Sequence, residues 1–353
     1  MSPPLAGRIR AVDWLRGVAT LAMIETHALA LLKPGLRAGR WFVHLDGLNG
    51  LVAPAFIFAA GFSLALVQAR GAASGARGKR VLRTLRRILE VLLVGTLVNW
   101  AWFPIFREPH WILRIDILQC IGLALLLALP ILALLAPHPR ALGWAALALA
   151  AACFGAAPLA EGIRGPLAHF ANVSSGSVFP LLPWSGYVYL GASAGAVAAG
   201  GRRGALVGWL LFLSAAGLAC HLARPLFLAA YPPHTFWLTD PSGHADRWAL
   251  VSLAAAALVW IEGRLGANFR PGPALAFVTV FGQSSLAAYF FHELLLYRGL
   301  FGLCLAAFWA DRSGWALYLA LTALLVGLTY GLCRLTDAGY RIYDRALFGW
   351  LKS

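Results

Sequence analysis

The N-terminal stretch Arg8-Ile-Arg-Ala-Val-Asp13-Trp-Leu-Arg16-Gly17 opens an apolar run that ends near His27, and this run decides the fold. At 1.5 Å per residue, a helix separates His27 from Asp13 by roughly 21 Å, so chemically competent groups lie at both ends of one membrane helix. A polar loop with Trp41 and His44 follows. The chain then continues into a second apolar run that reads Asn49-Gly50-Leu-Val-Ala-Pro54-Ala-Phe-Ile-Phe-Ala-Ala-Gly61.

The composition of the whole chain is that of a polytopic membrane protein. Of its 353 residues, 60% are hydrophobic and only 12% are charged, and the mean hydropathy is +0.74. A chain with so few polar side chains cannot cover the surface of a water-soluble globule. The first apolar run is too long for a signal-peptide core and shows no small-residue cleavage site, so we expect it to remain as the first span.

Apolar runs of about 17–25 residues predict ten transmembrane helices in an all-α bundle. They lie near 12–32, 50–69, 84–104, 116–136, 141–157, 180–199, 204–223, 246–262, 274–296 and 314–334. The segment 299–310 is about 12 residues long, which is too short to cross the membrane, so we expect a re-entrant or interfacial piece. If that segment did cross, the count would be eleven. We predict one domain over 1–353 with an interfacial tail at 338–353, where aromatic and basic residues mix.

The net charge of +15 is expected to set the topology, and nucleic-acid binding is not expected. With ten spans and a cytoplasmic N-terminus, 19 of the 29 Lys and Arg residues fall on the inner side. An eleventh span would move the last four of them outside. Both termini are therefore predicted to be cytoplasmic. The five cysteines have no paired spacing, which predicts buried thiols without a disulfide framework or a zinc site.

Ionisable residues in or near membrane spans are energetically expensive and are therefore candidates for function. In the predicted topology five of them lie toward the outer membrane face: His27, His44, Asp116, His292 and Glu293. Histidine is the usual general base near neutral pH, with an acid to orient it. Each histidine could instead be a buried or capping side chain without a chemical role. No His-x-x-x-His or His-Glu-x-x-His spacing occurs, so no metal site is predicted.

Five charged residues at the predicted inner face could meet a phosphorylated cytosolic ligand. Arg83, Arg86 and Arg87 recur at helical spacing at the start of the third span, where they could equally anchor lipid headgroups. Asp13 and Arg16 are three residues apart, so they could form an ion pair at the entrance of the first helix.

Polar and aromatic residues on the predicted outer side are candidates for binding a substrate. They are Asn49, Arg114, Gln119 and Trp184. Aromatic rings with hydrogen-bonding neighbours suit stacking on sugar rings, although an aromatic belt at the membrane interface has the same composition.

Four short motifs, taken in order, resemble bacterial relatives of the heparan-alpha-glucosaminide N-acetyltransferase catalytic domain, a family of transmembrane acyltransferases. They are Asp13-Trp-Leu-Arg16-Gly17 with His27, Pro54-Ala-Phe-Ile-Phe-Ala-Ala-Gly61, Arg114-Ile-Asp-Ile-Leu-Gln119-Cys-Ile-Gly122 and Gly282-Gln-Ser-Ser-Leu-Ala-Ala-Tyr289-Phe-Phe-His292-Glu293. The resemblance implies that an acyl group passes from cytosolic acetyl-CoA to an acceptor sugar across the membrane, with a histidine of the first extracytosolic loop as the catalytic residue.

The resemblance leaves the choice of base open between two histidines. His44 matches the family's loop histidine by position, and His27 matches a polar position near the end of the first helix. The loop around His44 is spaced differently from that of the lysosomal enzyme. An acidic residue that often precedes the Pro-Phe-like segment is replaced here by Val52-Ala53.

The resemblance therefore implies a bacterial inner-membrane acyltransferase that takes acetyl-CoA or another acyl-CoA as donor and a sugar or glycolipid as acceptor, among membrane lipids. The sequence leaves the oligomeric state open, a homodimer included. The main alternative is a proton-coupled carrier or flippase for a lipid-linked or anionic solute. A carrier should show broken helices around a midplane site, whereas the polar groups predicted here gather toward the outer face. A scaffold without catalysis would need no such gathering of histidines.

Overall fold

The structure, a computed structural model, describes residues 8–102, 108–266, 269–298 and 303–348. Within these ranges every regular element is a helix, and the only β-bridge pairs Leu32 with Ser313. The prediction of an all-α fold is therefore confirmed. The chain divides into two compact units, Met1–Val12 with Ala53–Asn268 and Asp13–Val52 with Phe269–Ser353, and each is described by itself.

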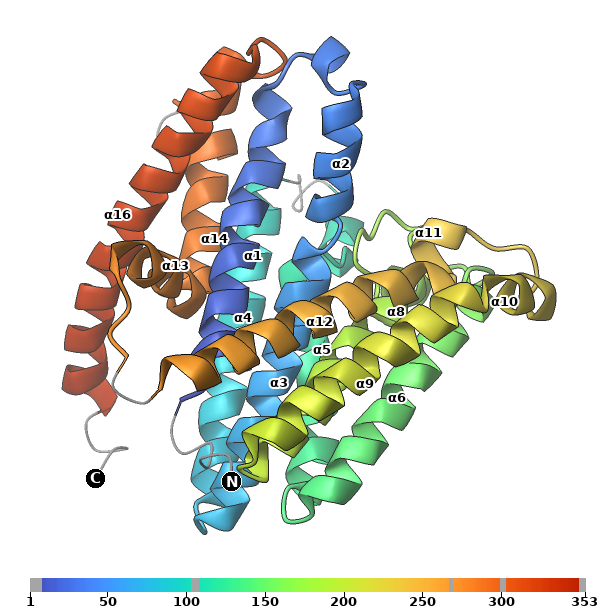
Figure 1. Cartoon of the computed structure of the whole chain (residues 1–353). Helices are drawn as coiled ribbons and strands as arrows, with labels where there is room; N and C mark the ends of the chain where they lie inside the picture. Colours follow the sequence, from blue (N-terminus) through green and yellow to red (C-terminus); the bar gives the residue numbers. More distant parts are fainter. Residues whose placement is uncertain (1–7, 103–107, 267–268, 299–302, 349–353) are drawn as a thin grey trace. The chain divides into compact units, whose positions relative to one another are not determined.

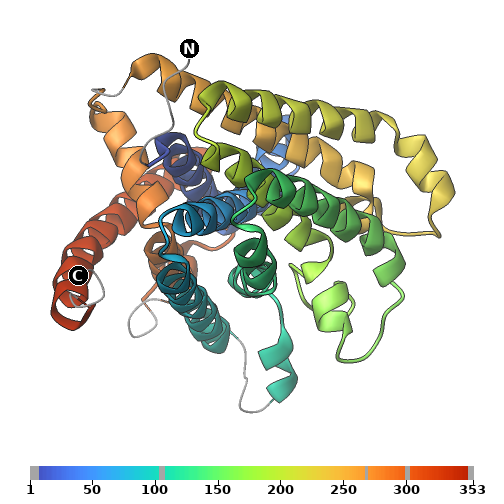
Figure 2. The same ribbon diagram turned by 90° about the horizontal axis from the view of Figure 1, so that it is seen from below.

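The first unit holds most of the long helices. They are α3 (Val52–Ala73), α4 (Arg77–Trp102), α5 (Ile117–Leu135), α6 (Pro139–Ala160), α8 (Leu181–Ala199), α9 (Arg203–Leu222) and α12 (Pro241–Leu265). Short helices join them: η3 (Pro109–Leu113), α7 (Ala168–Ala171), α10 (Arg224–Ala230) and α11 (Phe236–Thr239). Figures 1 and 2 both show α9 and α12 lying side by side along their length.

Glycines allow α3 and α8 to touch backbone to backbone inside the first unit. A Cβ atom on Gly61 would lie 1.9 Å from the carbonyl oxygen of Val188, and one on Gly191 would lie 1.9 Å from that of Phe58. Helices in a membrane associate through such close packing of small residues, because lipid tails supply no hydrophobic driving force. The α3–α8 contact therefore forms a dense centre in this unit.

The second unit is built on α1 (Arg10–Ala28), whose first turn belongs to the first unit. The turns η1 (Leu29–Leu31) and η2 (Pro34–Leu36) and helix α2 (Arg40–Asn49) follow it. The C-terminal part supplies α13 (Pro273–Gln283), α14 (Ser285–Glu293) with its π-helical continuation η4 (Leu294–Arg298), α15 (Leu305–Trp309) and α16 (Trp315–Phe348). A Cβ on Gly282 would lie 1.8 Å from the Asp13 carbonyl oxygen, so α1 crosses α13 in backbone contact.

Six of the described helices are long and apolar enough to cross a membrane, or seven if the bent pair α13 and α14 counts as one span. The chain is therefore a multi-pass membrane protein. A helix overlaps each of the ten predicted spans. Their full number and the side on which the termini lie stay predictions. All five cysteines are free.

The structure adds detail to one local prediction and corrects another. The segment 274–296, predicted to be one span, forms two helices that meet at 83°, as in a broken span or a re-entrant loop. Ser284 leaves helical geometry there (φ −110°, ψ 28°), and its hydroxyl donates to the Asp337 carboxylate of α16 at 2.8 Å. The prediction of a polar loop around His44 is wrong, because residues 40–49 form helix α2.

The C-terminal predictions fall partly outside the described residues. Within 299–310, residues 299–302 lie outside them, and the remainder contains only the five-residue helix α15, which is too short to cross a membrane. Helix α16 runs to Phe348 without a break at 338. The side chains of 340–353 lie outside the described part, so the interfacial tail stays a prediction.

Candidate active site

The ends of α1 and α14 bring two histidines and a glutamate together in the second unit. The Nδ1 atom of His27 lies 2.7 Å from Nε2 of His292 and 2.8 Å from Oε1 of Glu293. The two imidazole rings stack at a centroid distance of 4.9 Å. His292 is fully buried and Glu293 is 7% exposed, whereas the side chain of His27 is 31% exposed. Residues 265 positions apart in the sequence thus form one cluster.

The hydrogen bonds of the cluster define which ring nitrogens carry protons. The Nδ1 atom of His292 lies 2.8 Å from the Ala288 carbonyl oxygen, so it must donate, and Nε2 of neutral His292 is then an acceptor. The Nδ1–H of His27 therefore points at two acceptors, His292 and Glu293. Nε2 of neutral His27 keeps a lone pair, and it makes no hydrogen bond in the part of the chain that the structure describes. His27 is thus arranged as a base whose imidazolium form would lie beside a buried carboxylate.

Further side chains of the second unit hold α1 in place near this cluster. Tyr297 of η4 donates to the carbonyl oxygen of His27 at 3.0 Å. Glu25, one half-turn before His27, accepts from Asn49 of α2 at 2.9 Å and from the hydroxyl of Tyr318 of α16. These bonds join α1 to α2, η4 and α16, so three elements fix the end of α1.

The same cluster is the only group among the described residues whose histidine, cysteine and carboxylate atoms lie close enough to share a metal ion. Two imidazoles and a carboxylate are ligands that zinc or non-haem iron accepts. The separations of 2.7 and 2.8 Å are ordinary hydrogen-bond distances, and the proton on Nδ1 of His27 accounts for both. The prediction of a site without metal stays a prediction.

The other candidate base, His44, is not joined to this cluster. Its side chain is exposed on α2, and no hydrogen bond or ion pair involves it among the described residues. Asn49, five residues later, does reach the cluster's surroundings through Glu25. The geometry therefore favours His27 over His44 as the base.

The predicted donor-binding residues divide between the two units. In the second unit, the Arg16 guanidinium donates to the hydroxyl of Ser285 at 2.6 Å, which ties α1 to the start of α14, and Asp13 is buried. In the first unit, the basic residues of α4 are partly or fully exposed, and Arg86 pairs with Glu90 at 2.9 Å. Arg83 and Arg87 lie on exposed positions of the same helix.

The remaining predicted residues all lie in the first unit. Asp116 pairs with Arg114 at 3.0 Å, and Arg114 also donates to the Gly176 carbonyl oxygen at 2.6 Å. Among the described residues Asp116 therefore orients an arginine, and no histidine. Gln119 is buried with its side-chain oxygen unpartnered in the described structure, and Trp184 packs edge-on against Phe179.

Two acidic residues with clear roles escaped the sequence analysis. Glu25 lies inside an apolar run two residues before His27, and an acid in such a run is itself a signal of function. Glu161 ends α6 and accepts hydrogen bonds from a backbone N–H 74 positions later and from a hydroxyl 78 positions later. No pattern in the sequence marks those partners, because they meet only through packing.

Comparison with protein families matches residues 8–225 to the family described as "Heparan-alpha-glucosaminide N-acetyltransferase, catalytic". The matched region is more than half of the chain and includes α1 with His27, while His292 and Glu293 lie beyond it. Comparison with curated proteins gives no match.

Proposed function

Because the chain belongs to the heparan-alpha-glucosaminide N-acetyltransferase catalytic family, we propose that it is a membrane acyltransferase that carries an acetyl or longer acyl group from cytosolic acyl-CoA to an extracytoplasmic sugar or glycolipid. Family membership implies acetyltransferase activity and acetyl-CoA as the general donor. The direction of transfer, the acceptor and the catalytic base are our additions.

The observation that carries the proposal is the open nitrogen of His27 beside the buried carboxylate of Glu293. In the reaction, Nε2 of His27 takes the proton from an acceptor hydroxyl or amine as that group attacks the thioester carbonyl carbon. The carbon–sulfur bond then breaks, and the imidazolium returns its proton to the departing thiolate. The products are an acyl ester or amide and free CoA thiol, so atoms and charge balance.

The neighbours of His27 have separate tasks in this scheme. Glu293 stabilises the imidazolium that forms transiently, since an opposite charge within hydrogen-bond distance favours the protonated ring. His292, fixed by the Ala288 carbonyl, keeps the Nδ1 proton of His27 directed inward. We assign no catalytic step to His44 or Asp116.

We further propose that the chain crosses a bacterial inner membrane ten times, with both termini on the cytoplasmic side and membrane lipids around the bundle. In this topology Asp13 and Arg16 of the second unit and, separately, the basic residues of α4 in the first unit are assigned to the inner face, where the arginines would meet the phosphates of acyl-CoA. The exposure of Arg83 and Arg87 supports that role. Asn49, Arg114, Gln119 and Trp184 would contact the acceptor.

The test is release of free CoA thiol from acetyl-CoA by purified protein, with a panel of amino sugars and neutral sugars as acceptors. Wild type should give acceptor-dependent release, His27→Ala should abolish it, and His44→Ala should retain it. Circular dichroism and size-exclusion profiles must show that each variant is folded. Acceptor-dependent release that survives in His27→Ala would overturn the assignment of the base.

One observation favours a second candidate function, a proton-coupled carrier. The bend of 83° between α13 and α14 is a broken helix of the kind found in transporters, and a titratable cluster ends α14. In a carrier, protonation of the cluster would drive solute movement across the membrane. Solute-dependent proton uptake by proteoliposomes, lost in Glu293→Gln and accompanied by no thiol release, would support the carrier against the acyltransferase.

A further inference from the structure

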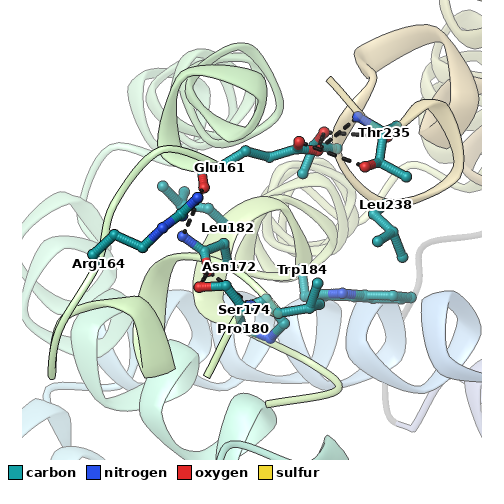
Figure 3. A pocket seen from close by; sticks show the side chains of 11 residues that line it. Glu161, Arg164, Asn172, Ser174, Pro180, Leu182, Trp184, Thr235 and Leu238 are labelled. Carbon is teal, nitrogen blue, oxygen red and sulfur yellow. Dashed lines mark hydrogen bonds between the residues drawn. The ribbon is translucent and has the colours of Figure 1, made fainter. Parts of the chain in front are cut away.

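The first unit contains a small hollow of mixed polar and apolar lining at the ends of α6, α8 and α11. Its volume is about 220 Å³, and its lining includes Glu161, Arg164, Asn172, Trp184, Thr235 and Leu238 (Figure 3). Pockets for drug-sized ligands usually measure roughly 300–1,000 Å³. The hollow therefore suits a ligand the size of one six-membered ring with its substituents.

Glu161 supplies a carboxylate that can accept further hydrogen bonds. Its Oε1 accepts from the backbone N–H of Thr235 at 2.8 Å and from the hydroxyl of Thr239. Among the described residues its Oε2 meets only the hydroxyl of Thr235, at 3.5 Å, which is a long contact. One carboxylate oxygen thus holds α11 in place, and the other can accept hydrogen bonds from a ligand.

Arg164 supplies the matching donors. One terminal nitrogen donates to the carbonyl oxygens of Glu161 at 2.7 Å and Ile163 at 3.2 Å. A guanidinium has five N–H groups, and the remaining ones make no hydrogen bond within the described residues. The side chain is exposed, so those donors are open to a ligand in the hollow.

The walls of the hollow are fixed before any ligand binds. Asn172 is buried and commits its whole amide to the chain, donating to Ala160 at 2.7 Å and to Ile163 at 3.0 Å and accepting from the Ser174 N–H at 2.9 Å. These hydrogen bonds hold the turn after α6. Because the turn is already ordered, ligand binding does not have to supply the free energy of ordering it.

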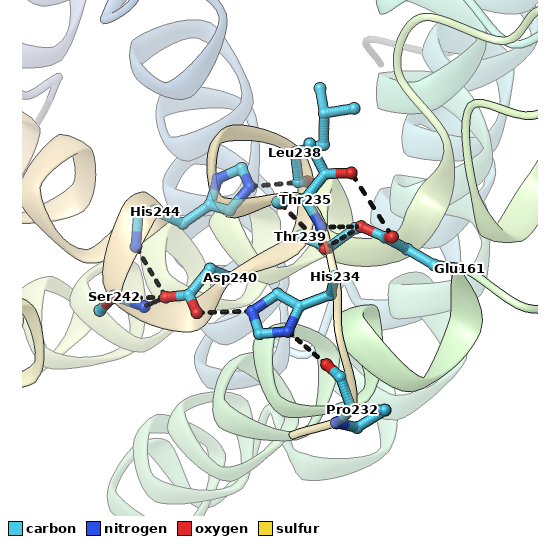
Figure 4. A network of polar contacts seen from close by, with 10 residues as sticks. Glu161, Pro232, His234, Thr235, Leu238, Thr239, Asp240, Ser242 and His244 are labelled. Atoms are coloured by element: carbon cyan, nitrogen blue, oxygen red, sulfur yellow. Dashed lines mark hydrogen bonds and ion pairs between the residues drawn. The ribbon is translucent and has the colours of Figure 1, made fainter. Parts of the chain in front are cut away.

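A second network fixes α11, which begins after Thr235 and carries Leu238 (Figure 4). Nε2 of His244 donates to the Leu238 carbonyl oxygen at 3.0 Å, so its Nδ1 accepts from the hydroxyl of Tyr187 at 2.9 Å. Asp240 accepts from His234 at 2.6 Å and caps α12. These contacts hold α11 in addition to the bonds from Glu161 that join it to the end of α6.

From this chemistry we propose that the hollow is a binding site for a single sugar ring. One carboxylate and one guanidinium bring no net charge, which favours a neutral ligand over a phosphate or a bare cation. Sugar hydroxyls both donate and accept, so they can satisfy Glu161 and Arg164 together. The indole of Trp184 offers an apolar wall for the C–H face of the ring. A purely apolar ligand would leave both charged groups desolvated without partners.

The binding itself rests on the first unit alone. Binding can therefore be measured without acyl-CoA, and its failure would leave thiol release untouched as a separate result.

The experiment is a calorimetric titration of the whole chain in lipid nanodiscs that contain no glycolipid and no sugar detergent. The probes are N-acetylglucosamine, glucosamine, methyl glucoside, glycine betaine and inorganic phosphate. We expect saturable binding of at least one sugar and none of betaine or phosphate. Leu238→Trp should abolish it by filling the hollow, and Arg164→Gln should weaken it at least about tenfold, because charge-assisted hydrogen bonds are lost.

Matched controls separate the site from general effects. Leu226→Trp places the same indole on α10 at a residue that is 72% exposed and does not line the hollow, and Arg140→Gln removes an exposed arginine at the other end of α6. Both should bind sugar as wild type does. No saturable sugar binding, or sugar binding that Leu238→Trp and Arg164→Gln leave unchanged, would overturn the proposal. Betaine or phosphate binding that these variants abolish, without sugar binding, would overturn the choice of ligand.

Discussion

Each unit of the molecule contains a histidine hydrogen-bonded to a carboxylate. The two pairs differ in how many ring nitrogens of the histidine are used in hydrogen bonds. In the first unit, His234 uses both ring nitrogens, one toward the Pro232 carbonyl at 2.7 Å and the other toward Asp240 at 2.6 Å. In the second unit, His27 uses only Nδ1 and keeps Nε2 open. We expect the unused ring nitrogen, more than the histidine–carboxylate pair itself, to suit His27 to act as a base.

The two pairs also differ in burial, and the histidine with the unused nitrogen is the more exposed one. The side chains of His234 and Asp240 are 2% and 0% exposed, whereas that of His27 is 31% exposed beside Glu293 at 9%. A ligand can therefore approach His27 but not His234. We expect the first pair to serve stability and the second to serve chemistry.

The largest expected effect is on turnover. His27→Gln keeps a polar side chain but no base, so acyl transfer should fall roughly 100- to 10,000-fold, which is the usual contribution of general base catalysis. Glu293→Gln should cause a smaller loss, because the base remains without its counter-charge. The thiol-release assay measures both. His138→Gln, exposed at the start of α6, is the matched control and should turn over as wild type. Wild-type turnover in His27→Gln would remove the distinction between the two pairs.

A large effect on stability is expected in the other pair. Asp240→Ala removes the carboxylate that binds His234 and caps α12, leaving a buried histidine unpaired. Breaking one side of such a buried pair should lower the free energy of unfolding by about 3–5 kcal/mol. Unfolding in mixed micelles with increasing dodecyl sulfate measures it. Asp46→Ala, an exposed acid on α2, is the control. Equal unfolding midpoints for the two variants would contradict the structural role of Asp240.

An intermediate effect is expected from the support around His27. Tyr318→Phe removes only the hydroxyl that binds Glu25, so the end of α1 should shift slightly and turnover should fall roughly tenfold. The loss should appear in kcat with little change in the KM for acetyl-CoA. Tyr330→Phe, on the same helix with its ring against Phe277, should leave both parameters unchanged. Identical behaviour of the two variants would show that Glu25 does not position the base.

The smallest expected effect is the pH dependence of the His234–Asp240 pair. Burial alone would lower the pKa of His234, but hydrogen bonds to Pro232 and Asp240 outweigh it and raise this pKa above 6.5. Burial likewise opposes ionisation of Asp240, yet hydrogen bonds from Ser242 and His234 bring its pKa below 3.8.

The sign of the effect follows from these directions. A raised histidine pKa stabilises the fold fully below about pH 6.5, and this stabilisation is lost as the pH rises through the pKa of the folded state. A lowered carboxyl pKa stabilises the fold above about pH 3.8, and this stabilisation is lost as the pH falls through the carboxyl pKa of the folded state. The melting deficit of His234→Gln should therefore be largest near pH 5–6 and shrink at higher pH. In an Asp240→Asn background the same substitution should lose much of this pH dependence, because the Asp240 carboxylate no longer raises the pKa of His234.

Several features of the fold and the site were readable from the sequence. Length, apolar fraction and runs long enough to cross a membrane determine an all-helical multi-pass protein, because backbone groups in lipid must satisfy one another within each segment. The rarity of ionisable residues in apolar runs marked His27, His292 and Glu293 as candidates. The same rule could have marked Glu25. The motifs also predicted the family, which the match over residues 8–225 confirms.

The tertiary structure alone decided which of these groups meet and which remain open. Whether His27 or His44 faces Glu293 depends on how α1 crosses α13 and where α14 bends at Ser284, and neither leaves a periodic signal in the chain. Glu161 and Thr235 come together across 74 positions for the same reason. The apolar pattern selects helices because it acts locally, residue by residue. Hydrogen-bond partners distant in sequence are chosen by close packing, which depends on the shape of every neighbouring side chain.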